Sequence, residues 1–147
     1  MSKKPAFKPQ GFHTVNPYFA VGGAARFLDF LSFAFGAEEV GERFMGPDGS
    51  IMHAAAQIGD SMIEVSDFPD QPTSAALHVY VEDADAHYRR AIEAGAESLR
   101  EPTTTFYGER SAGVRDPWGN SWWIGCHVED VSPEEMSRRM AVEHEKS

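Results

Sequence analysis

The 147-residue chain has one cysteine, no long apolar run and few basic residues, and each scarcity excludes a class of protein. A single cysteine, Cys126, rules out an intrachain disulfide. No run approaches the roughly 18 apolar residues of a membrane span. Lysine and arginine number 13 against 23 acidic residues, a formal net charge of −10, which repels phosphate backbones and anionic lipid. We therefore expect neither a nucleic-acid nor a membrane partner.

Recognised catalytic motifs are also missing. The sequence contains no phosphate-binding loop, no dinucleotide fingerprint, no His-Glu-x-x-His and no nucleophile elbow. Cys126 lies in an apolar stretch, which favours a buried small hydrophobic residue over a reactive thiol. The first residues are charged and lack the apolar core of a signal peptide, so the sequence predicts a cytoplasmic protein.

The sequence contains an internal repeat of about 60 residues. In each half a helical stretch is followed by two strand-like runs that meet at a tight turn. The matching positions are Val21 and Val81, Gly36 and Gly95, and Gly59 and Gly119, at offsets of 60, 59 and 60 residues. A period of this length indicates a duplicated supersecondary unit. One βαβββ unit has too little interior to stand alone, so two copies should pack together.

The duplication predicts an organisation in five segments. These are a flexible arm (1–12), a first βαβββ module (13–68), a linker (69–75), a second module (76–128), and a C-terminal helix with its tail (129–147). Helices are expected over 23–35, 84–94 and from 133 to about 144. The last begins with a capping box formed by Ser132 and Glu135. The first two each carry an apolar stripe, namely Ala24, Phe27, Leu28, Leu31 and Phe35, and then Ala84, His87 or Tyr88, Ala91 and Ile92. Strands are expected over 14–21, 38–44, 50–58, 61–67, 76–82, 97–101, 109–115 and 121–128, with a loop over 102–108.

The first hairpin gives the most specific structural prediction. A two-residue turn at Gly59 and Asp60 pairs Ile58 with Ser61, and therefore Ala55 with Glu64. One face, suited to packing under a helix, then carries Met52, Ala54, Ile63 and Val65. The opposite face, more polar and suited to lining a cleft, carries His53, Ala55, Gln57, Met62, Glu64 and Ser66.

Five stretches resemble the vicinal oxygen chelate superfamily, and within it the PhnB-like subgroup. They are Asn16–Tyr18, Phe35–Glu38, Phe106–Arg110, Val114–Gly119 and His127–Glu135. That superfamily includes glyoxalase I, bleomycin resistance proteins and extradiol dioxygenases. The resemblance implies an α+β fold, in which two βαβββ modules form a half-barrel cleft, and it implies a homodimer. It does not imply one activity, because a single fold hosts many chemistries.

The resemblance also indicates where a metal would be held. Family members with metal chemistry place one ligand on the first and one on the last strand of each module, near Asn16, Glu64, Ala76 and Trp123 here. Only Glu64 is a good ligand, because Ala76 cannot coordinate and Trp123 presents an apolar plate. The usual four-ligand metal site is therefore not expected.

A different metal site can be drawn from the strand faces. His53, Glu64 and His78 could form a two-histidine, one-carboxylate set for a divalent ion such as zinc, iron, manganese or nickel. The alternative is a pair of hydrogen-bonded histidines in a polar cleft. Without a metal, Glu64 is a candidate general base or a counter-ion for a cation, and its other role would be an ion pair with Arg110 or Arg115.

The remaining candidates are aromatic and basic. Tyr80, Tyr107 and Trp123 would stack on a flat ligand, while Trp122 points to the opposite face and belongs to the core. Arg110 would hold an anion or carboxylate, or else join the two modules. The leading function is a small-molecule-binding protein, suited by its acidity to a planar cation. The alternatives are a divalent-metal lyase, isomerase or dioxygenase, and a non-catalytic scaffold or regulatory partner.

Overall fold

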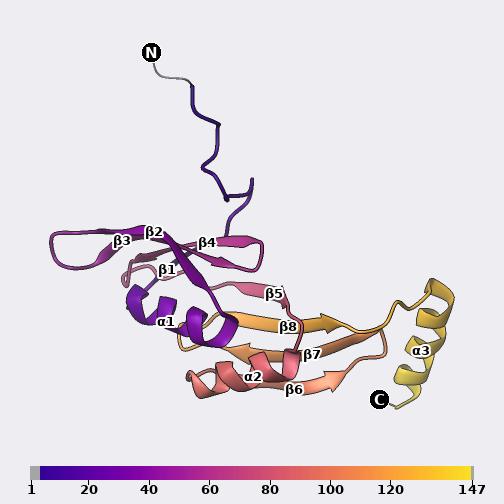
Figure 1. The fold of residues 1–147 in the computed structure, drawn as a ribbon. Helices are drawn as coiled ribbons and strands as arrows, with labels where there is room; N and C mark the ends of the chain where they lie inside the picture. Colours follow the sequence, from indigo (N-terminus) through magenta and orange to yellow (C-terminus); the bar gives the residue numbers. More distant parts are fainter. Residues whose placement is uncertain (1–3, 147) are drawn as a thin grey trace. The chain divides into compact units, whose positions relative to one another are not determined.

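The computed structural model describes residues 4–146, which divide into two compact units, one ending at Ser74 and one beginning at Ala75. Unit 1 contains β1 (Tyr18–Val21), α1 (Ala24–Phe35), β2 (Glu38–Met45), β3 (Ile51–Ile58) and β4 (Ser61–Asp67) (Figure 1). Unit 2 contains β5 (Ala76–Tyr80), α2 (Ala84–Glu93), β6 (Glu97–Thr104), β7 (Glu109–Arg115), β8 (Ser121–His127) and α3 (Pro133–Lys146). None of the described helices is both long and apolar enough to cross a membrane.

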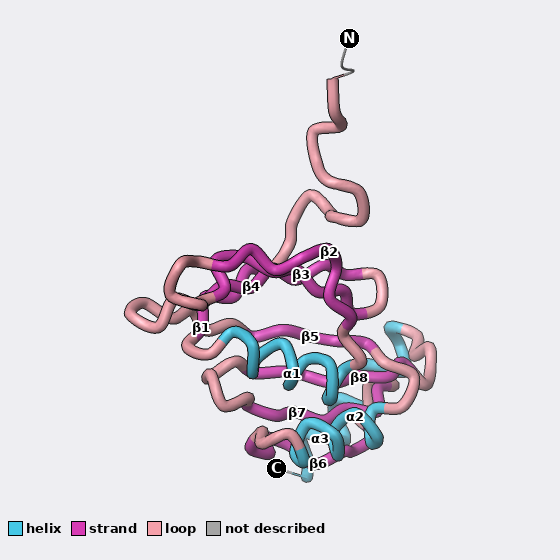
Figure 2. Tube along the Cα trace, turned by 60° about the vertical axis from the view of Figure 1, so that its left-hand side comes forward, coloured by secondary structure: helices cyan, strands magenta, loops and turns pink. Residues whose placement is uncertain are grey.

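Each unit contains one four-stranded sheet, and the two sheets share one strand order. Sheet A runs β1-β4-β3-β2 and sheet B runs β5-β8-β7-β6. In each sheet the first strand is parallel to the last, and the other pairs are antiparallel. Figure 2 shows the strands of each sheet side by side, with a long loop leading into β1. The predicted α+β fold of two βαβββ modules with a C-terminal helix is confirmed.

The first hairpin has the register that its two-residue turn predicts, with Ile58 opposite Ser61 and Ala55 opposite Glu64. Its apolar face packs under α1, where the Phe19 and Phe27 rings lie 5.1 Å apart. Gly36 ends α1 in the left-handed conformation, at φ 70°. The helix buries Ala24, Phe27, Leu28, Phe30, Leu31, Ala34 and Phe35, which includes the whole predicted stripe.

Two strand boundaries differ from the prediction. β1 begins at Tyr18 rather than at 14, because the Asn16 amide closes a turn on His13 and Pro17 has no N–H to offer a neighbouring strand. β6 continues to Thr104 rather than ending at 101, so the predicted 102–108 loop is only a short turn. Pro102 is tolerated there because β6 is the edge strand of sheet B.

Four burial predictions also need correction. Met52, assigned to the face that packs under α1, is 53 % exposed, because it lies near the start of β3. Met62 lies on the face predicted to be polar but is 2 % exposed, and Gly11 of the N-terminal segment lies beside its Cε. Cys126 is only half-buried, and its thiol contacts the Glu82 carbonyl at 3.5 Å, because it lies near the end of β8. α2 buries fewer residues than its predicted stripe, namely Ala84 and Ala91.

Candidate functional site

A histidine–carboxylate pair lies on the face of sheet A that α1 does not cover. Because Ala55 opposes Glu64, His53 is the diagonal neighbour of Glu64 across the hairpin. Its Nε2 atom lies 3.0 Å from Oε1 of Glu64, with both side chains partly exposed. Tyr18 opposes Glu64 on the other side, and its ring centroid lies 6.3 Å from that of His53. The sequence predicted that His53 and Glu64 lie together. It placed Tyr18 within the first strand but did not predict that Tyr18 lies beside this pair.

The corresponding face of sheet B carries a different row of side chains. Read across the sheet, neighbouring strands contribute Arg100, Gly113, Trp123 and His78. The Trp123 ring lies against the backbone of β7, since a Cβ at position 113 would lie 2.6 Å from its Cε3 atom. Arg100 extends over the same ring, with Cζ 5.6 Å from the centroid, a distance typical of a cation–π contact.

A second glycine shapes the next row of this face. Gly125 opposes Tyr80, and a Cβ there would lie 2.9 Å from Cε1 of His78. The His78 and Tyr80 rings therefore lie close to the backbone of β8, with centroids 4.4 Å apart. We call Arg100, His78, Tyr80 and Trp123 the aromatic face of sheet B. Three of its four members were predicted, and Arg100 was not.

A chain of polar groups borders the aromatic face. The Tyr80 hydroxyl donates to Oε1 of Glu109 at 2.9 Å, and this bond, together with the negative charge, raises the pKa of Tyr80. Oε2 of Glu109 lies 3.4 Å from Nδ1 of His127, and Nε2 of His127 lies 2.7 Å from Asp130. The hydrogen bond to Asp130 and the charge of Glu109 raise the pKa of His127. Both residues lie in stretches that carry the family resemblance, but the sequence analysis gave Glu109 and His127 no role in the site, because their contacts join separate segments of the chain.

Arg110 lies on the opposite side of sheet B from Trp123. Its guanidinium forms two hydrogen bonds of 2.8 Å with Asp85 of α2, the helix that covers that side. The Arg110 side-chain hydrogen bond lowers the pKa of Asp85, as expected for a two-pronged ion pair. Arg110 therefore does not share a face with the aromatic residues.

Tyr107 lies in the turn between β6 and β7, 40 % exposed and edge-on to Phe106. The turn is closed by Thr105, whose N–H donates to the Glu109 carbonyl and whose hydroxyl contacts that residue. Gly108 has φ 90° and leaves no room for a side chain, because the Glu129 carbonyl lies against it. The turn is thereby fixed against the segment that leads to α3.

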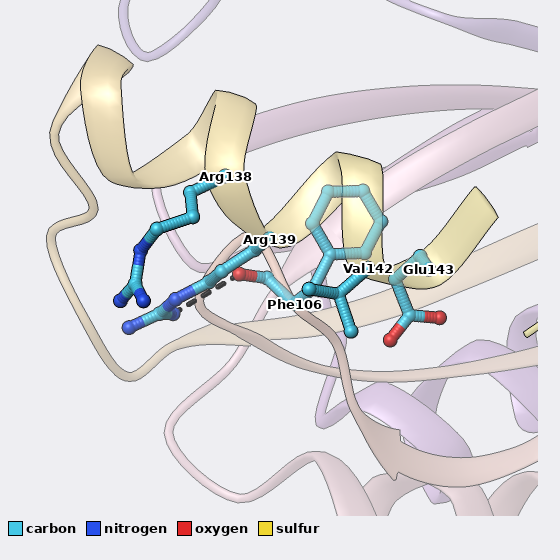
Figure 3. A pocket seen from close by; sticks show the side chains of 5 residues that line it. All are labelled: Phe106, Arg138, Arg139, Val142 and Glu143. Atoms are coloured by element: carbon cyan, nitrogen blue, oxygen red, sulfur yellow. Dashed lines mark hydrogen bonds between the residues drawn. The ribbon is translucent and has the colours of Figure 1, made fainter. Parts of the chain in front are cut away.

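A small pocket of about 180 Å³ lies between this turn and α3. Figure 3 shows its lining residues, which are Phe106, Arg138, Arg139, Val142 and Glu143. Arg139 donates to the Phe106 carbonyl at 3.1 Å and pairs with Glu129 at 2.8 Å. The predicted cap of α3 is present, since Ser132 accepts from the Glu135 N–H, while the Glu135 carboxylate pairs with Arg139. α3 has no fully buried residue, and Arg139 joins it to the turn through the Phe106 carbonyl.

Residues 12–124 match the Glyoxalase/Bleomycin resistance protein/Dioxygenase superfamily. The chain belongs to this superfamily. An uncharacterized protein of Mycobacterium bovis is 34 % identical over 140 residues, covering 86 % of this chain and 91 % of the relative. A second, from Mycobacterium tuberculosis, is 34 % identical over 140 residues and covers 86 % and 82 %.

Solved structures also resemble this chain in fold. TioX from Micromonospora sp. ML1 has a TM-score of 0.61 at 25 % identity, covering 78 % of this chain and 99 % of that one. A PhnB protein from Bacillus cereus has a TM-score of 0.61 at 16 % identity, over 78 % and 99 %. The second likeness shows the fold alone. The superfamily predicted from the sequence is confirmed, and a PhnB protein is among the structures that share its fold.

The residues at the four expected ligand positions do not fit the superfamily's usual metal centre. Ala76 and Trp123 supply no ligand atom. The amide of Asn16 is committed to the backbone of His13, accepting its N–H at 2.9 Å and donating to its carbonyl at 2.8 Å. Only Glu64 keeps ligand chemistry. Within neither unit do the residues from 4 to 146 gather three or more His, Cys, Asp or Glu groups able to hold a metal.

Proposed function

We propose that this protein binds a small molecule with a flat ring on the aromatic face of sheet B, without the usual four-ligand metal centre of its superfamily. The observation that supports this most directly is the position of Trp123. Its ring lies at an expected ligand position and rests on Gly113, beside His78 in the neighbouring strand. A ring supported in this way is organised before the ligand arrives, which lowers the entropic cost of stacking.

Superfamily membership by itself does not choose between binding and catalysis, because its description names enzymes and a resistance protein together. The side chains favour binding. Tyr80, His78 and Trp123 offer ring surface, and each stacking contact contributes roughly 0.5–1.5 kcal/mol beyond area burial. Glu64 stays a candidate general base and Tyr107 a candidate contact, whereas Arg110 lies on the other side of sheet B, paired with Asp85.

Ligand screening by thermal shift tests the proposal. A flat ligand at about 100 times its dissociation constant should stabilise the protein by about 2.7 kcal/mol. The same ligand should lose that effect on Trp123→Ala and keep it on Phe33→Ala, which truncates an exposed aromatic residue of α1. A library of flat compounds that produces no shift in the unaltered protein, or a shift that Trp123→Ala leaves intact, would contradict it.

One contact favours a second function, that of a divalent-metal lyase, isomerase or dioxygenase. Two residues of the predicted ligand set, His53 and Glu64, already lie 3.0 Å apart in unit 1. Elemental analysis of protein purified without chelators should then show a metal that is lost in Glu64→Gln. Metal-free protein that gains no stability from added divalent ions would remove this alternative. The homodimer and the cytoplasmic location remain predictions.

A further inference from the structure

The positively charged side chains on the aromatic side of sheet B differ in whether a carboxylate lies beside them. Among the residues that the structure describes, the other cations of this face lie beside carboxylates. Arg115 lies 4.0 Å from Glu97, and His127 lies between Glu109 and Asp130. Among the same described residues, Arg100 contacts the Trp123 ring and one neutral group. That group is the Ser111 hydroxyl, which accepts a hydrogen bond from Nη1 of Arg100 at 3.4 Å. The guanidinium nearest the stacking surface is thus the one without a carboxylate.

The placement of Arg100 depends on the glycine between it and the tryptophan. Strands lie about 4.8 Å apart, so residues on β6 and β8 are separated by about 10 Å of sheet. Because Gly113 has no side chain, the Trp123 ring lies over the backbone of β7, and the long arginine side chain reaches that ring from β6. Arg100 is itself exposed, so its planar set of N–H donors is available to a ligand lying on the ring.

We propose that the ligand of this face is a planar aromatic carboxylate, its ring stacked on Trp123 and its carboxylate paired with Arg100. This rests on the function proposed above and names its ligand class. A neutral ring would leave the guanidinium without a counter-charge, and a cationic ring would meet it at contact distance. The protein's net charge of −10 adds little preference for a cation at this ring, because salt screens exposed charges that lie more than about 8 Å away.

The choice of carboxylate reverses the expectation drawn from composition. The acidic residues that dominate the formal charge are spread over the chain, and the carboxylates of this face are already engaged. Glu109 accepts from Tyr80 and lies beside His127, and Glu97 lies near Arg115. Arg100 is therefore the charged side chain that lies over the Trp123 ring itself.

Three ligands of one shape and different charge test the inference. 2-Naphthoate, 2-naphthamide and protonated 2-naphthylmethylamine are titrated against the full chain by isothermal calorimetry. We expect the carboxylate to bind about tenfold or more tighter than the amide, as a charge-assisted hydrogen bond allows, and the amine to bind weakest. Tightest binding by the amine or the amide would overturn the inference while leaving the proposed function standing.

Two arginine variants separate a specific contact from general charge. Arg100→Gln should abolish the preference for naphthoate over naphthamide, by about tenfold, and change the amide affinity less than about twofold. Arg115→Gln removes the same charge from the same face and should preserve the preference. Equal losses in the two variants, or no loss in Arg100→Gln, would overturn the inference.

A glycine variant tests the stacking surface separately. Gly113→Ala places a methyl group where the Trp123 ring lies, so all three naphthyl compounds should weaken by a similar factor with their order unchanged. Circular dichroism and the naphthoate-to-naphthamide ratio distinguish a displaced ring from an unfolded chain. If no naphthyl compound binds while other flat ligands bind through Trp123, the inference fails alone. If no flat compound binds at all, the proposed function fails with it.

Discussion

The two units share a strand order but hold their helices in different ways. α1 begins after Gly23, at φ 82°, and has no side-chain cap of its own. Its first N–H groups, those of Gly23 and Ala24, instead donate to Oδ1 of Asp67 at 3.0 and 2.7 Å, from the far end of β4. α2 is capped locally by Asp83, which accepts from Ala86 at 3.0 Å.

In each unit one carboxylate accepts hydrogen bonds from several N–H groups, and this carboxylate lies at a different place in the two units. In unit 1 it is Asp67, which binds the start of α1 and accepts from Ile51 of β3 at 2.8 Å. In unit 2 it is Asp116 in the β7–β8 turn, 3 % exposed, with donors from three residues. The donors are the backbone N–H of Trp118, the backbone N–H and the side-chain amide of Asn120, and Nε1 of Trp122. A shared topology thus fixes which backbone groups need partners, but not which side chain supplies them.

The largest expected effect lies in the turns, where the two units differ most. Asp116→Ala leaves several buried donors without an acceptor and should lower the free energy of unfolding by about 3–5 kcal/mol. Asp60→Ala, in the two-residue turn of unit 1, removes one long contact of 3.3 Å to Ser61 and should cost about 0.5 kcal/mol or less.

Urea unfolding followed by tryptophan fluorescence measures both variants. Asp116→Asn is the control of matched shape, because it keeps one acceptor oxygen and replaces only the other, which accepts in the wild-type chain, with an NH2 donor. Equal costs for Asp116→Ala and Asp60→Ala would show that the buried network does not distinguish the two turns.

The next largest effect lies at the helix starts. Asp67→Ala removes three charge-assisted bonds and should cost about 2–3 kcal/mol, whereas Asp83→Ala removes one exposed cap and should cost about 1 kcal/mol. Urea unfolding at neutral pH compares them. A larger loss in Asp83→Ala would contradict the difference described here.

Asp67 also predicts a dependence on pH. Burial would raise the pKa of Asp67, but hydrogen bonds from Ala24, Ile51 and Gly23 outweigh it, so the pKa is below its ordinary value of 3.8. Its contribution to stability is therefore complete above pH 3.8 and is lost as the pH falls through the folded-state pKa. Asp67→Asn should flatten that part of the acid stability curve, and an unchanged curve would contradict the assignment.

A smaller effect concerns His127 in unit 2. Its pKa is raised chiefly by the hydrogen bond to Asp130, so Asp130→Asn should lower it more than Glu109→Gln does. The stabilisation is complete below the ordinary histidine value of 6.5 and is lost as the pH rises through the folded-state pKa. Proton NMR titration of the ring measures the shift, and the reverse order of the two variants would be inconsistent with this geometry.

The smallest effect is expected at the histidine pair of unit 1. His53 is partly exposed, so His53→Ala should change the free energy of unfolding by only about 0.2–1 kcal/mol. A loss of several kcal/mol would mean that His53 is part of the core rather than of a ligand-binding face. Urea unfolding beside Gln57→Ala, an exposed residue of the same strand, provides the comparison.

Local patterns in the sequence were enough to predict the modules, the helix stripe of α1 and the register of the first hairpin. Each depends on residues close together in the chain, because turn length fixes register and side-chain period fixes the buried face. The same alternation placed His53 beside Glu64 and set Trp122 and Trp123 on opposite faces of β8.

Only the tertiary structure decided the partners that lie far apart in the sequence. The cap that Asp67 supplies to α1 spans more than 40 residues. Arg100 could not be placed beside Trp123, because β6 shifts register on both sides of it and strict alternation fails there. Periodicity describes a strand's own faces, whereas contacts across a sheet depend on how irregular strands align, and that is settled only when the chain folds.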